Sequence, residues 1–443
     1  METERIFMTS RWSRRIISRD FLLLWFAQAG SSFGEYLFSA TAIVWVTTKL
    51  FPHSSQLPTF IALIVLSAAV PRIIVAPIAG VLVDRWSARR TMISSDAVRA
   101  LLFAILLAIL LYGRSSSTTQ YGTMLAILTL SNVAAQFFNP ARAALMQVII
   151  PPDRRIEAAS SAMFALTGVA MVATTLGPII FAILGPALSA VVCIAAYLLS
   201  LTMTYLVADR PVPSSGAPDH FWSDFAGGLR MAWGSGPLRA VLFGIVLYGI
   251  SLGINNTAIG LYSLKTLGLP PSRYGLLSMM FPAGNLVSAI VGVRLVKRVG
   301  MHRAYVLSLI GLGVGYLFFG LSHSIPVAFV MMFLCGLVFS IYVMCQGPIV
   351  QEATPAGYMG RITAITSPAT AISSAVGTVF VSQLLSLFIG HTSAVSGHLP
   401  NSYGAAIATG AVCMLIGGVI MLAAQRRRSA NSPQPQDSPA TSG

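Results

Sequence analysis

Gly80-Val-Leu-Val-Asp84-Arg85-Trp86-Ser87-Ala88-Arg89-Arg90 is a short charged segment between two apolar stretches, 57–83 and 91–112. Each stretch is long enough to cross the hydrocarbon core of a bilayer as a helix, which needs about 20 residues. Ten more such stretches occur along the chain. We therefore predict twelve spans, at 21–48, 57–83, 91–112, 119–150, 157–185, 187–208, 238–265, 273–296, 304–322, 326–351, 362–390 and 404–424.

The composition agrees with an all-α membrane protein. Of the 443 residues, 55% are hydrophobic and 9% are charged, and the mean hydropathy is +0.77. A soluble domain carries about 25% charged residues, so a water-soluble enzyme and a disordered chain are both excluded. All four cysteines fall inside apolar stretches, and no metal-binding or phosphate-binding motif is present. We expect no disulfide, no metal, no cofactor and no catalysed reaction.

The net charge of +15 follows the predicted topology. With the N-terminus in the cytoplasm, 21 of the 28 Lys and Arg residues lie on the cytoplasmic side and four lie outside. This asymmetry is the positive-inside pattern of membrane proteins. We therefore expect both termini in the cytoplasm, and we assign the basic surface to anionic lipid rather than to nucleic acid.

The spans divide into two groups of six that repeat one another. Gly30 and Gly34 in the first half correspond to Gly249 and Gly253 in the second, an offset of 219 residues. Internal repeats of this kind are typical of secondary transporters. We predict five segments: a basic cytoplasmic tail 1–20, a first bundle 21–208, a linker 209–237 with an amphipathic helix, a second bundle 238–424 and a disordered cytoplasmic tail 425–443.

Several motifs resemble those of a known family. The segment 80–90 resembles the signature of the major facilitator superfamily, with Ser87 where the family prefers Gly. Ser95-Asp96-x-x-Arg99 and Phe138-Asn139-Pro140-Ala141-Arg142 resemble the branch of proton-driven exporters that includes macrolide efflux pumps and the enterobactin exporter. The resemblance implies two pseudo-symmetric six-helix bundles, alternating access and a proton gradient as the energy source.

The charged loop is a candidate conformational switch. It forms an ion cluster at the joint of two bundles, and the resemblance places Asp84 against the start of the stretch 362–390 in one conformation only. Such a contact can bias a two-state equilibrium. The alternative is a plain positive-inside loop. The switch candidates are Gly80, Asp84, Arg85, Arg89, Arg90, Asp96 and Arg99.

Polar groups inside spans are candidates for the substrate cavity, because their burial in a membrane is costly. If the family architecture holds, most of these groups line a central cavity. The alternative for each amide is a hydrogen bond between helices. The candidates are Gln28, Asn132, Gln136, Asn139, Arg142, Asn255, Asn256, Asn285, Tyr342 and Gln346.

Glu35 is the candidate for proton coupling. It is the only one of the 13 acids that we place well inside a span, about 21 Å from the cytoplasmic end at ~1.5 Å per residue. Arg72 lies at roughly 16 Å on the same scale and is the cation expected within its reach. We predict that Glu35 binds a proton in one access state and releases it in the other. The alternatives are a permanent Glu35–Arg72 pair and a Glu35 wetted by an outer cavity.

These features predict a monomeric exporter in the plasma (inner) membrane that moves amphipathic small molecules, such as drugs, macrolides or siderophores, against protons. A nutrient importer or facilitator of the same fold is the alternative within the class. A membrane scaffold or receptor that does not transport is the alternative from another class.

Overall fold

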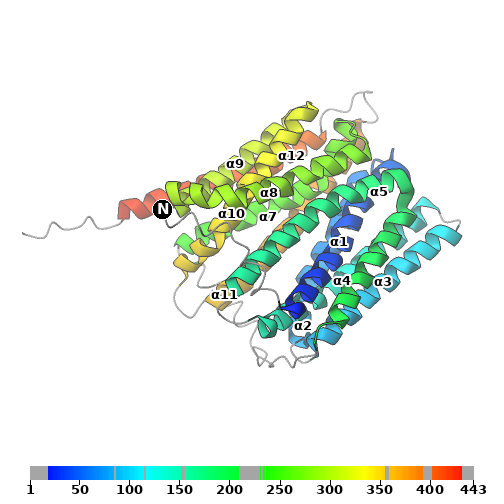
Figure 1. The fold of residues 1–443 in the computed structure, drawn as a ribbon. Coiled ribbons are helices and arrows are strands. Elements are labelled where there is room, and N and C mark those ends of the chain that lie inside the picture. Colours follow the sequence, from blue (N-terminus) through cyan, green and yellow to red (C-terminus); the bar gives the residue numbers. More distant parts are fainter. Residues whose placement is uncertain are drawn as a thin grey trace, which may run out of the picture.

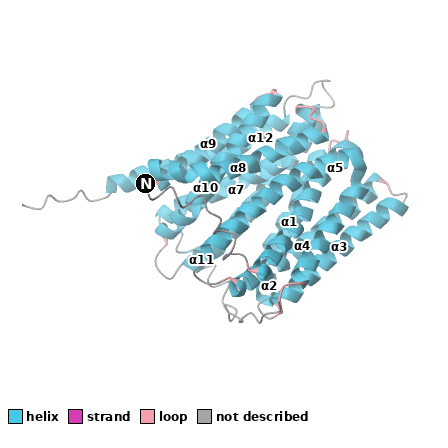
Figure 2. Cartoon of the chain, viewed as in Figure 1, coloured by secondary structure: helices cyan, strands magenta, loops and turns pink. Residues whose placement is uncertain are grey.

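The computed structural model describes residues 18–83, 86–113, 116–150, 155–208, 230, 233–234, 236–354, 359–392 and 402–431. Within these ranges the chain is helical with short connections and contains no strand (Figure 2). The all-α fold class predicted from the sequence is therefore confirmed. Most of the predicted amphipathic linker helix, and Asp84 and Arg85 of the charged loop, lie outside the described residues.

The helices of the first half are α1 (Arg19–Trp45), α2 (Leu57–Val83), α3 (Ala88–Tyr112), α4 (Ser117–Ile149) and α5 (Arg155–Tyr205). Those of the second half are α7 (Gly236–Leu261), α8 (Pro271–Val299), α9 (Met301–Leu321), α10 (Ile325–Ala353), α11 (Met359–Thr392) and α12 (Ser402–Asn431). Two π-helical turns, η2 (Val46–Leu50) and η4 (Tyr262–Thr266), continue α1 and α7. Because α12 runs to Asn431, the prediction of a disordered tail from residue 425 is wrong at its start.

α5 consists of two helices that meet at Gly185, where the backbone has φ 76° and ψ −176°. Pro186 follows directly and cannot donate a backbone hydrogen bond across the break. The predicted boundary between the stretches 157–185 and 187–208 falls at this position. Counted this way, the described residues form twelve long helices.

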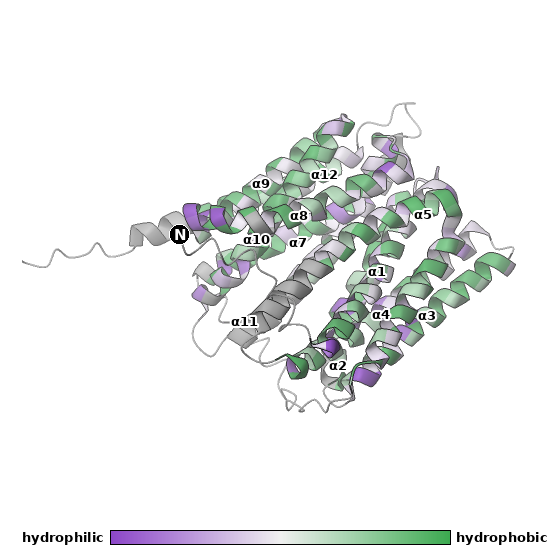
Figure 3. Cartoon of the chain, in the orientation of Figure 1, coloured by the Kyte–Doolittle hydropathy of each residue, from purple (hydrophilic) through white to green (hydrophobic). Residues whose placement is uncertain are grey.

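Most of these helices are long enough and apolar enough to cross a membrane. Nine described helices pass both criteria, with α5 counted once, and α8 adds a tenth if its two segments, bent by 60°, form one span. α1 is absent from this group because Gln28 and Glu35 make it more polar. Hydrophobic residues predominate along the helices (Figure 3). Many of them are exposed, such as Leu101 at 62% and Ile183 at 72%. Exposed apolar side chains of this kind suit a lipid environment.

Helix packing repeats between the halves. In the first half α1 packs on α5, α2 on α4, and α3 on α4 and α5. In the second half α7 packs on α11 and α12, α8 on α10, and α9 on α10 and α12. The halves lie side by side (Figure 1) and meet through the symmetric pairs α5–α8 and α2–α11. The packing therefore follows the duplication seen in the sequence.

The repeated glycines allow helices to approach closely. A β-carbon on Gly30 would lie 2.9 Å from the carbonyl oxygen of Ala196 on α5. A β-carbon on Gly249 would lie 3.0 Å from the carbonyl oxygen of Thr370 on α11. Small residues at helix contacts are the usual packing device in membranes.

We expect Gly185→Ala to destabilise the protein by about 1–3 kcal/mol, because its φ and ψ lie in a region that is essentially restricted to glycine. Thermal unfolding of the purified protein in one detergent measures the change. Gly122→Ala in α4 is the matched control, since a β-carbon at either position meets nothing within 4 Å. Equal thermal stability of the two variants would show that Gly185 is not held in this conformation.

Candidate functional site

A buried ionic network lies inside the first half, and we call it the Arg99 cluster: Ser31, Glu35, Asp96, Arg99 and Ser200. Arg99 on α3 is 1% exposed. Its Nη2 lies 3.2 Å from Oε2 of Glu35, and its Nη1 lies 3.8 Å from Oδ1 of Asp96. Nη1 also donates a hydrogen bond to Oγ of Ser31 at 2.7 Å. One guanidinium therefore contacts two carboxylates.

The remaining contacts join the cluster to four helices. The hydroxyls of Ser31 and Ser200 donate to the two oxygens of Asp96, at 2.9 and 2.5 Å. Nε of Arg99 donates to the carbonyl of Ser131 on α4 at 3.1 Å. The guanidinium carbon lies 5.3 Å from the ring centroid of Tyr197, which is a cation–π arrangement. The cluster thus connects α1, α3, α4 and α5.

The two carboxylates differ in access. The side chain of Glu35 is 33% exposed, whereas that of Asp96 is 0% exposed. Asp96 accepts from two hydroxyls and lies against Arg99, while the side-chain contact described for Glu35 is Arg99 alone. Glu35 is therefore the carboxylate that water or an ion reaches first.

This geometry corrects two predictions. The cation beside Glu35 is Arg99 and not Arg72, whose side chain is exposed on α2. Glu35 is also not the only acid deep in a span, because Asp96 is fully buried on α3. Asp96 and Arg99 belong to this cluster with Glu35, rather than to an ion cluster at the loop. The sequence signal for this was a charged i,i+3 pair inside an apolar stretch.

The other switch candidates lie near the loop. Arg89 donates from Nε to the carbonyl of Thr204 at 3.4 Å and from Nη2 to the carbonyl of Tyr205, and its guanidinium lies over the Tyr205 ring. It therefore caps the C-terminal end of α5, where a cation is favourable. Arg90 is exposed at the start of α3, and Gly80 lies within α2. The described contacts of Arg89 stay within the first half, and the contact of Asp84 with α11 remains a prediction.

The cavity candidates of the first half cluster on α4. Nδ2 of Asn132 donates to the carbonyl of Leu128 at 2.9 Å, and Nε2 of Gln136 donates to the carbonyl of Asn132 at 3.0 Å. Asn139 is exposed and Arg142 is half-buried. Gln28 on α1 is half-buried. The two amides thus use their own helix and not a neighbouring one.

The second-half candidates are less uniform. Tyr342 is 1% exposed, accepts from Nε2 of Gln346 at 3.2 Å and packs against the ring of Tyr248. Asn255 is 3% exposed and neither of its side-chain polar atoms has a partner among the described residues. Asn256 is exposed, and Oδ1 of Asn285 is buried without a partner in the part of the chain described.

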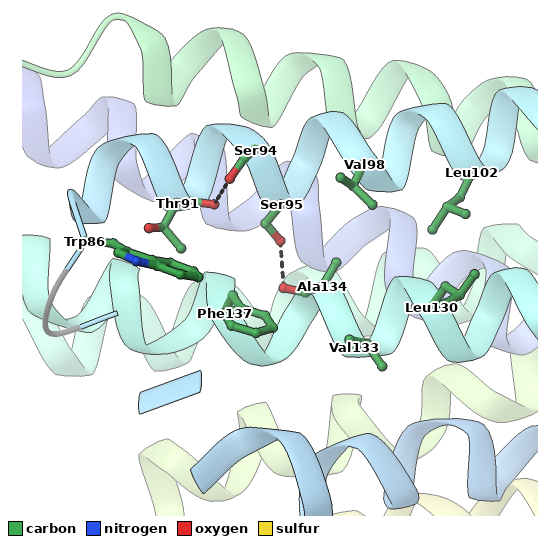
Figure 4. Close-up of a pocket in the computed structure, with 10 residues that line it drawn as sticks. All are labelled: Trp86, Thr91, Ser94, Ser95, Val98, Leu102, Leu130, Val133, Ala134 and Phe137. Carbon is green, nitrogen blue, oxygen red and sulfur yellow. Dashed lines mark hydrogen bonds between the residues drawn. The ribbon is translucent and has the colours of Figure 1, made fainter. Parts of the chain in front are cut away.

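A separate groove of about 360 Å³ lies between α3 and α4 (Figure 4). The rings of Trp86 and Phe137 are stacked, with 6.1 Å between their centroids. The hydroxyl of Ser95 donates a hydrogen bond to the carbonyl of Ala134 at 2.7 Å. Val98 and Leu130 in its lining are 47% and 51% exposed. This groove contains none of the predicted cavity residues, so we do not assign the substrate to it.

The two halves close against each other where α1 and α7 end, and we call this region the closed end. Nζ of Lys265 in η4 donates to the carbonyl of Pro52 at 2.7 Å. A β-carbon on Gly260 would lie 2.9 Å from Cγ2 of Ile43. Leu261, Leu264 and Tyr274 of the second half share a buried cluster with residues of α1 and η2. At this end the halves are therefore in direct contact.

Two pseudo-symmetric helix bundles with a buried ion cluster are the architecture of a membrane transporter. The family model of the Major Facilitator Superfamily matches residues 24–378. The chain belongs to this superfamily. It is a multi-pass membrane protein of the secondary transporter class, and its family and relatives are transporters rather than enzymes.

Two curated relatives match most of the chain. The uncharacterized MFS-type transporter YkuC of Bacillus subtilis (strain 168) is 22% identical over 361 residues, which are 78% of either protein. The lysophospholipid transporter LplT of Enterobacter sp. (strain 638) is 22% identical over 356 residues, covering 78% of this chain and 82% of LplT.

Solved structures share the fold. The nucleoside transporter NupG superposes with a TM-score of 0.69 at 11% identity, covering 92% of this chain and 98% of NupG. A peptide transporter of the POT family in complex with sulfate superposes with a TM-score of 0.70 at 15% identity. The match covers 92% of this chain and 94% of the peptide transporter. None of these matches decides between the efflux branch and other branches of the superfamily.

We expect Ile43→Cys combined with Gly260→Cys to form a disulfide across the closed end. The replacement removes Cγ2 of Ile43, and the two β-carbons then lie within about 4.5 Å, as a disulfide requires. The four native cysteines are first replaced, and the cross-link is read as a mobility shift after mild oxidation. Transport should stop on oxidation and return with reductant, while each single cysteine variant is unaffected. A cross-linked protein that still transports would show that this end does not need to open.

Proposed function

We propose that the protein is a proton-coupled exporter of amphipathic small molecules that works by alternating access in the plasma (inner) membrane. It acts as a monomer with both termini in the cytoplasm. The observation that supports proton coupling is the Arg99 cluster, in which one buried guanidinium is shared by two carboxylates of unequal access.

The net charge of the cluster favours uptake of a single proton. With Glu35, Asp96 and Arg99 all ionised, the cluster carries one negative charge inside the membrane. An uncompensated charge in this environment is costly, and a bound proton removes it. Protonation is therefore favourable because the cluster contains two acids and only one base.

Glu35 is the carboxyl that binds this proton. Asp96 is held as an acceptor by the hydroxyls of Ser31 and Ser200 and is shielded from water. Glu35 is one-third exposed and loses only its pairing with Arg99 when it is protonated. The released guanidinium keeps Asp96, Ser31 and the carbonyl of Ser131 as partners.

The closed end supports a proposal for the access state of the structure. Under the predicted topology, η2 and η4 lie at the outer surface, so contact between Lys265 and Pro52 seals the outside. We therefore propose that the structure corresponds to an inward-facing state in which Glu35 and Arg99 form an ion pair. This is the state in which an antiporter has released its proton and takes up substrate from the cytoplasm.

An amphipathic substrate is consistent with one relative, the lysophospholipid transporter LplT, whose named cargo combines a charged group with an acyl chain. NupG and the POT transporter share the fold, and their named substrates are nucleosides and peptides. An importer of the same fold is the competing proposal. Everted vesicles with an imposed pH gradient separate the two, since only the exporter accumulates substrate when the lumen is acidic.

We expect Glu35→Gln to lose transport driven by a pH gradient by at least about tenfold, because the amide cannot exchange a proton. Downhill exchange of substrate should be retained, because this mode does not require residue 35 to bind or release a proton. Uptake into everted vesicles and counterflow in proteoliposomes measure the two modes. Glu352→Gln is the control, as Glu352 is an exposed acid at the end of α10.

Two outcomes would contradict the coupling role of Glu35. Unimpaired gradient-driven transport in Glu35→Gln leaves no role for this carboxyl. Equal loss of both transport modes, together with a lower melting temperature, would show a static Glu35–Arg99 pair that serves only stability.

For the charged loop, we expect Asp84→Asn to insert normally and lose most transport in both modes, because it removes the charge proposed to lock one conformation. Transport in proteoliposomes at matched protein content is the measurement. If Asp84→Asn transports like the parent, the loop is not a conformational switch, and its charges serve only to set the membrane topology.

A further inference from the structure

Arg142 on α4 is a half-buried arginine whose Nε has no hydrogen-bond acceptor among the described residues. This Nε–H is buried and donates no hydrogen bond within the described part of the chain. Arg99, the other deeply placed arginine, has two carboxylates, a hydroxyl and a carbonyl around it. Arginines inside membranes are normally paired with acids or backbone carbonyls, so the unpaired Nε of Arg142 requires an explanation.

The position of Arg142 on α4 points away from the bilayer. Leu130 and Phe137 line the lipid-side groove between α3 and α4. At about 100° per residue, Asn139 lies about 180° around the helix from Leu130, and Arg142 lies about 120° from it. Asn139 is nevertheless exposed, so the face of α4 opposite the lipid groove is also open.

This face is polar along several turns, and its exposure increases from the buried Asn132 through the half-buried Gln136 to the exposed Asn139. Asn132, Gln136 and Asn139 precede Arg142 at spacings of three or four residues, which is one face of a helix. Pro140 adds to its polarity, because it has no N–H to donate to the carbonyl of Gln136. The stripe begins beside Ser131, whose carbonyl binds Arg99, and ends at Arg142 about 16 Å along the axis.

The side chains next to Arg142 on the helix are largely apolar. Phe138 and Leu145 are buried, at 3% and 0% exposure, and Met146 is half-buried. A small hydrated anion gains little from such surroundings. A ligand that carries an apolar portion beside its anionic group buries surface against them.

We propose that Arg142 binds the carboxylate or phosphate group of the transported molecule, and that the substrate class is therefore an anionic amphiphile. This proposal rests on the transport function proposed above and narrows its substrate. A separation of about 16 Å along α4 keeps the substrate's anion away from the Arg99 cluster. The anionic group of the substrate thus pairs with Arg142, and Glu35 remains paired with Arg99.

Binding of a fluorescently labelled dodecanoate and of its methyl ester tests this proposal. The full chain is placed in nanodiscs of phosphatidylcholine, which adds no net charge, and the dissociation constant is measured by fluorescence. The parent should bind the acid and bind the ester at least about tenfold more weakly. Arg142→Gln should weaken binding of the acid about 10–100-fold, the range of a charge-assisted hydrogen bond, and leave the ester unchanged.

Two further variants keep the result interpretable. Arg142→Lys retains the positive charge and should weaken acid binding less than Arg142→Gln does. Arg239→Gln removes an exposed arginine at the start of α7 and should bind both probes like the parent. All variants are compared at equal thermal stability, so that a fold defect is recognised by a loss of ester binding as well.

Equal binding of acid and ester by the parent, or unchanged acid binding in Arg142→Gln, would overturn the proposal. Acetate and inorganic phosphate serve as competitors. Displacement of the probe by either at millimolar concentration would show a site for small anions and overturn the amphiphile class. The assay uses no gradient and measures binding alone, so a failure here is distinct from a failure of proton coupling.

Discussion

The low dielectric of the membrane interior requires every buried charge to be compensated, and Arg99 is where this protein meets the requirement. One guanidinium contacts Glu35, Asp96, the hydroxyl of Ser31 and the carbonyl of Ser131. These partners come from three helices, and Ser200 on α5 joins through Asp96. The packing of the first half therefore depends on the charge state of this cluster, because a change at Glu35 alters the contacts between α1 and α3. This coupling of charge to helix contacts is what a proton-driven transporter needs.

The two halves share their helix packing but not the buried ionic cluster. An offset of 213 residues relates Asp84 and Arg90 of the charged loop to Lys297 at the end of α8 and Arg303 at the start of α9. At this offset, Asp96 and Arg99 correspond to Leu309 and Leu312 on α9. Both leucines are buried in the apolar core of the second half. That core instead holds stacked tyrosines, with Tyr342 lying 4.7 Å from Tyr248 and 5.2 Å from Tyr305 between ring centroids. Duplication has kept the helix packing, while the buried ion site described in the first half has no equivalent at these positions.

The helices could be predicted from the sequence because hydrocarbon thickness limits their length and proline and glycine mark their ends. The break within α5 at Gly185 coincides with the predicted boundary between the spans 157–185 and 187–208. The partner of Glu35 could not be predicted in the same way. Depth along a span is a single coordinate, and it favours Arg72, because a third span that begins at residue 91 places Arg99 only about 12 Å deep. Only the packing of α3 against α5 and of α5 against α1 brings Asp96 and Arg99 to Glu35. Asp96 was placed near the loop because the third span was expected to begin at residue 91, whereas α3 begins at Ala88.

The central claim is that the Arg99 cluster holds one exchangeable proton and that Glu35 carries it. Infrared difference spectroscopy of the purified protein in lipid, recorded between alkaline and near-neutral buffer so that exposed carboxylates stay ionised, tests this claim most directly. A single band of a protonated carboxyl group should appear on acidification, disappear in Glu35→Gln and persist in Glu352→Gln. A carboxyl band that remains in Glu35→Gln, or its absence from the parent, would contradict the account.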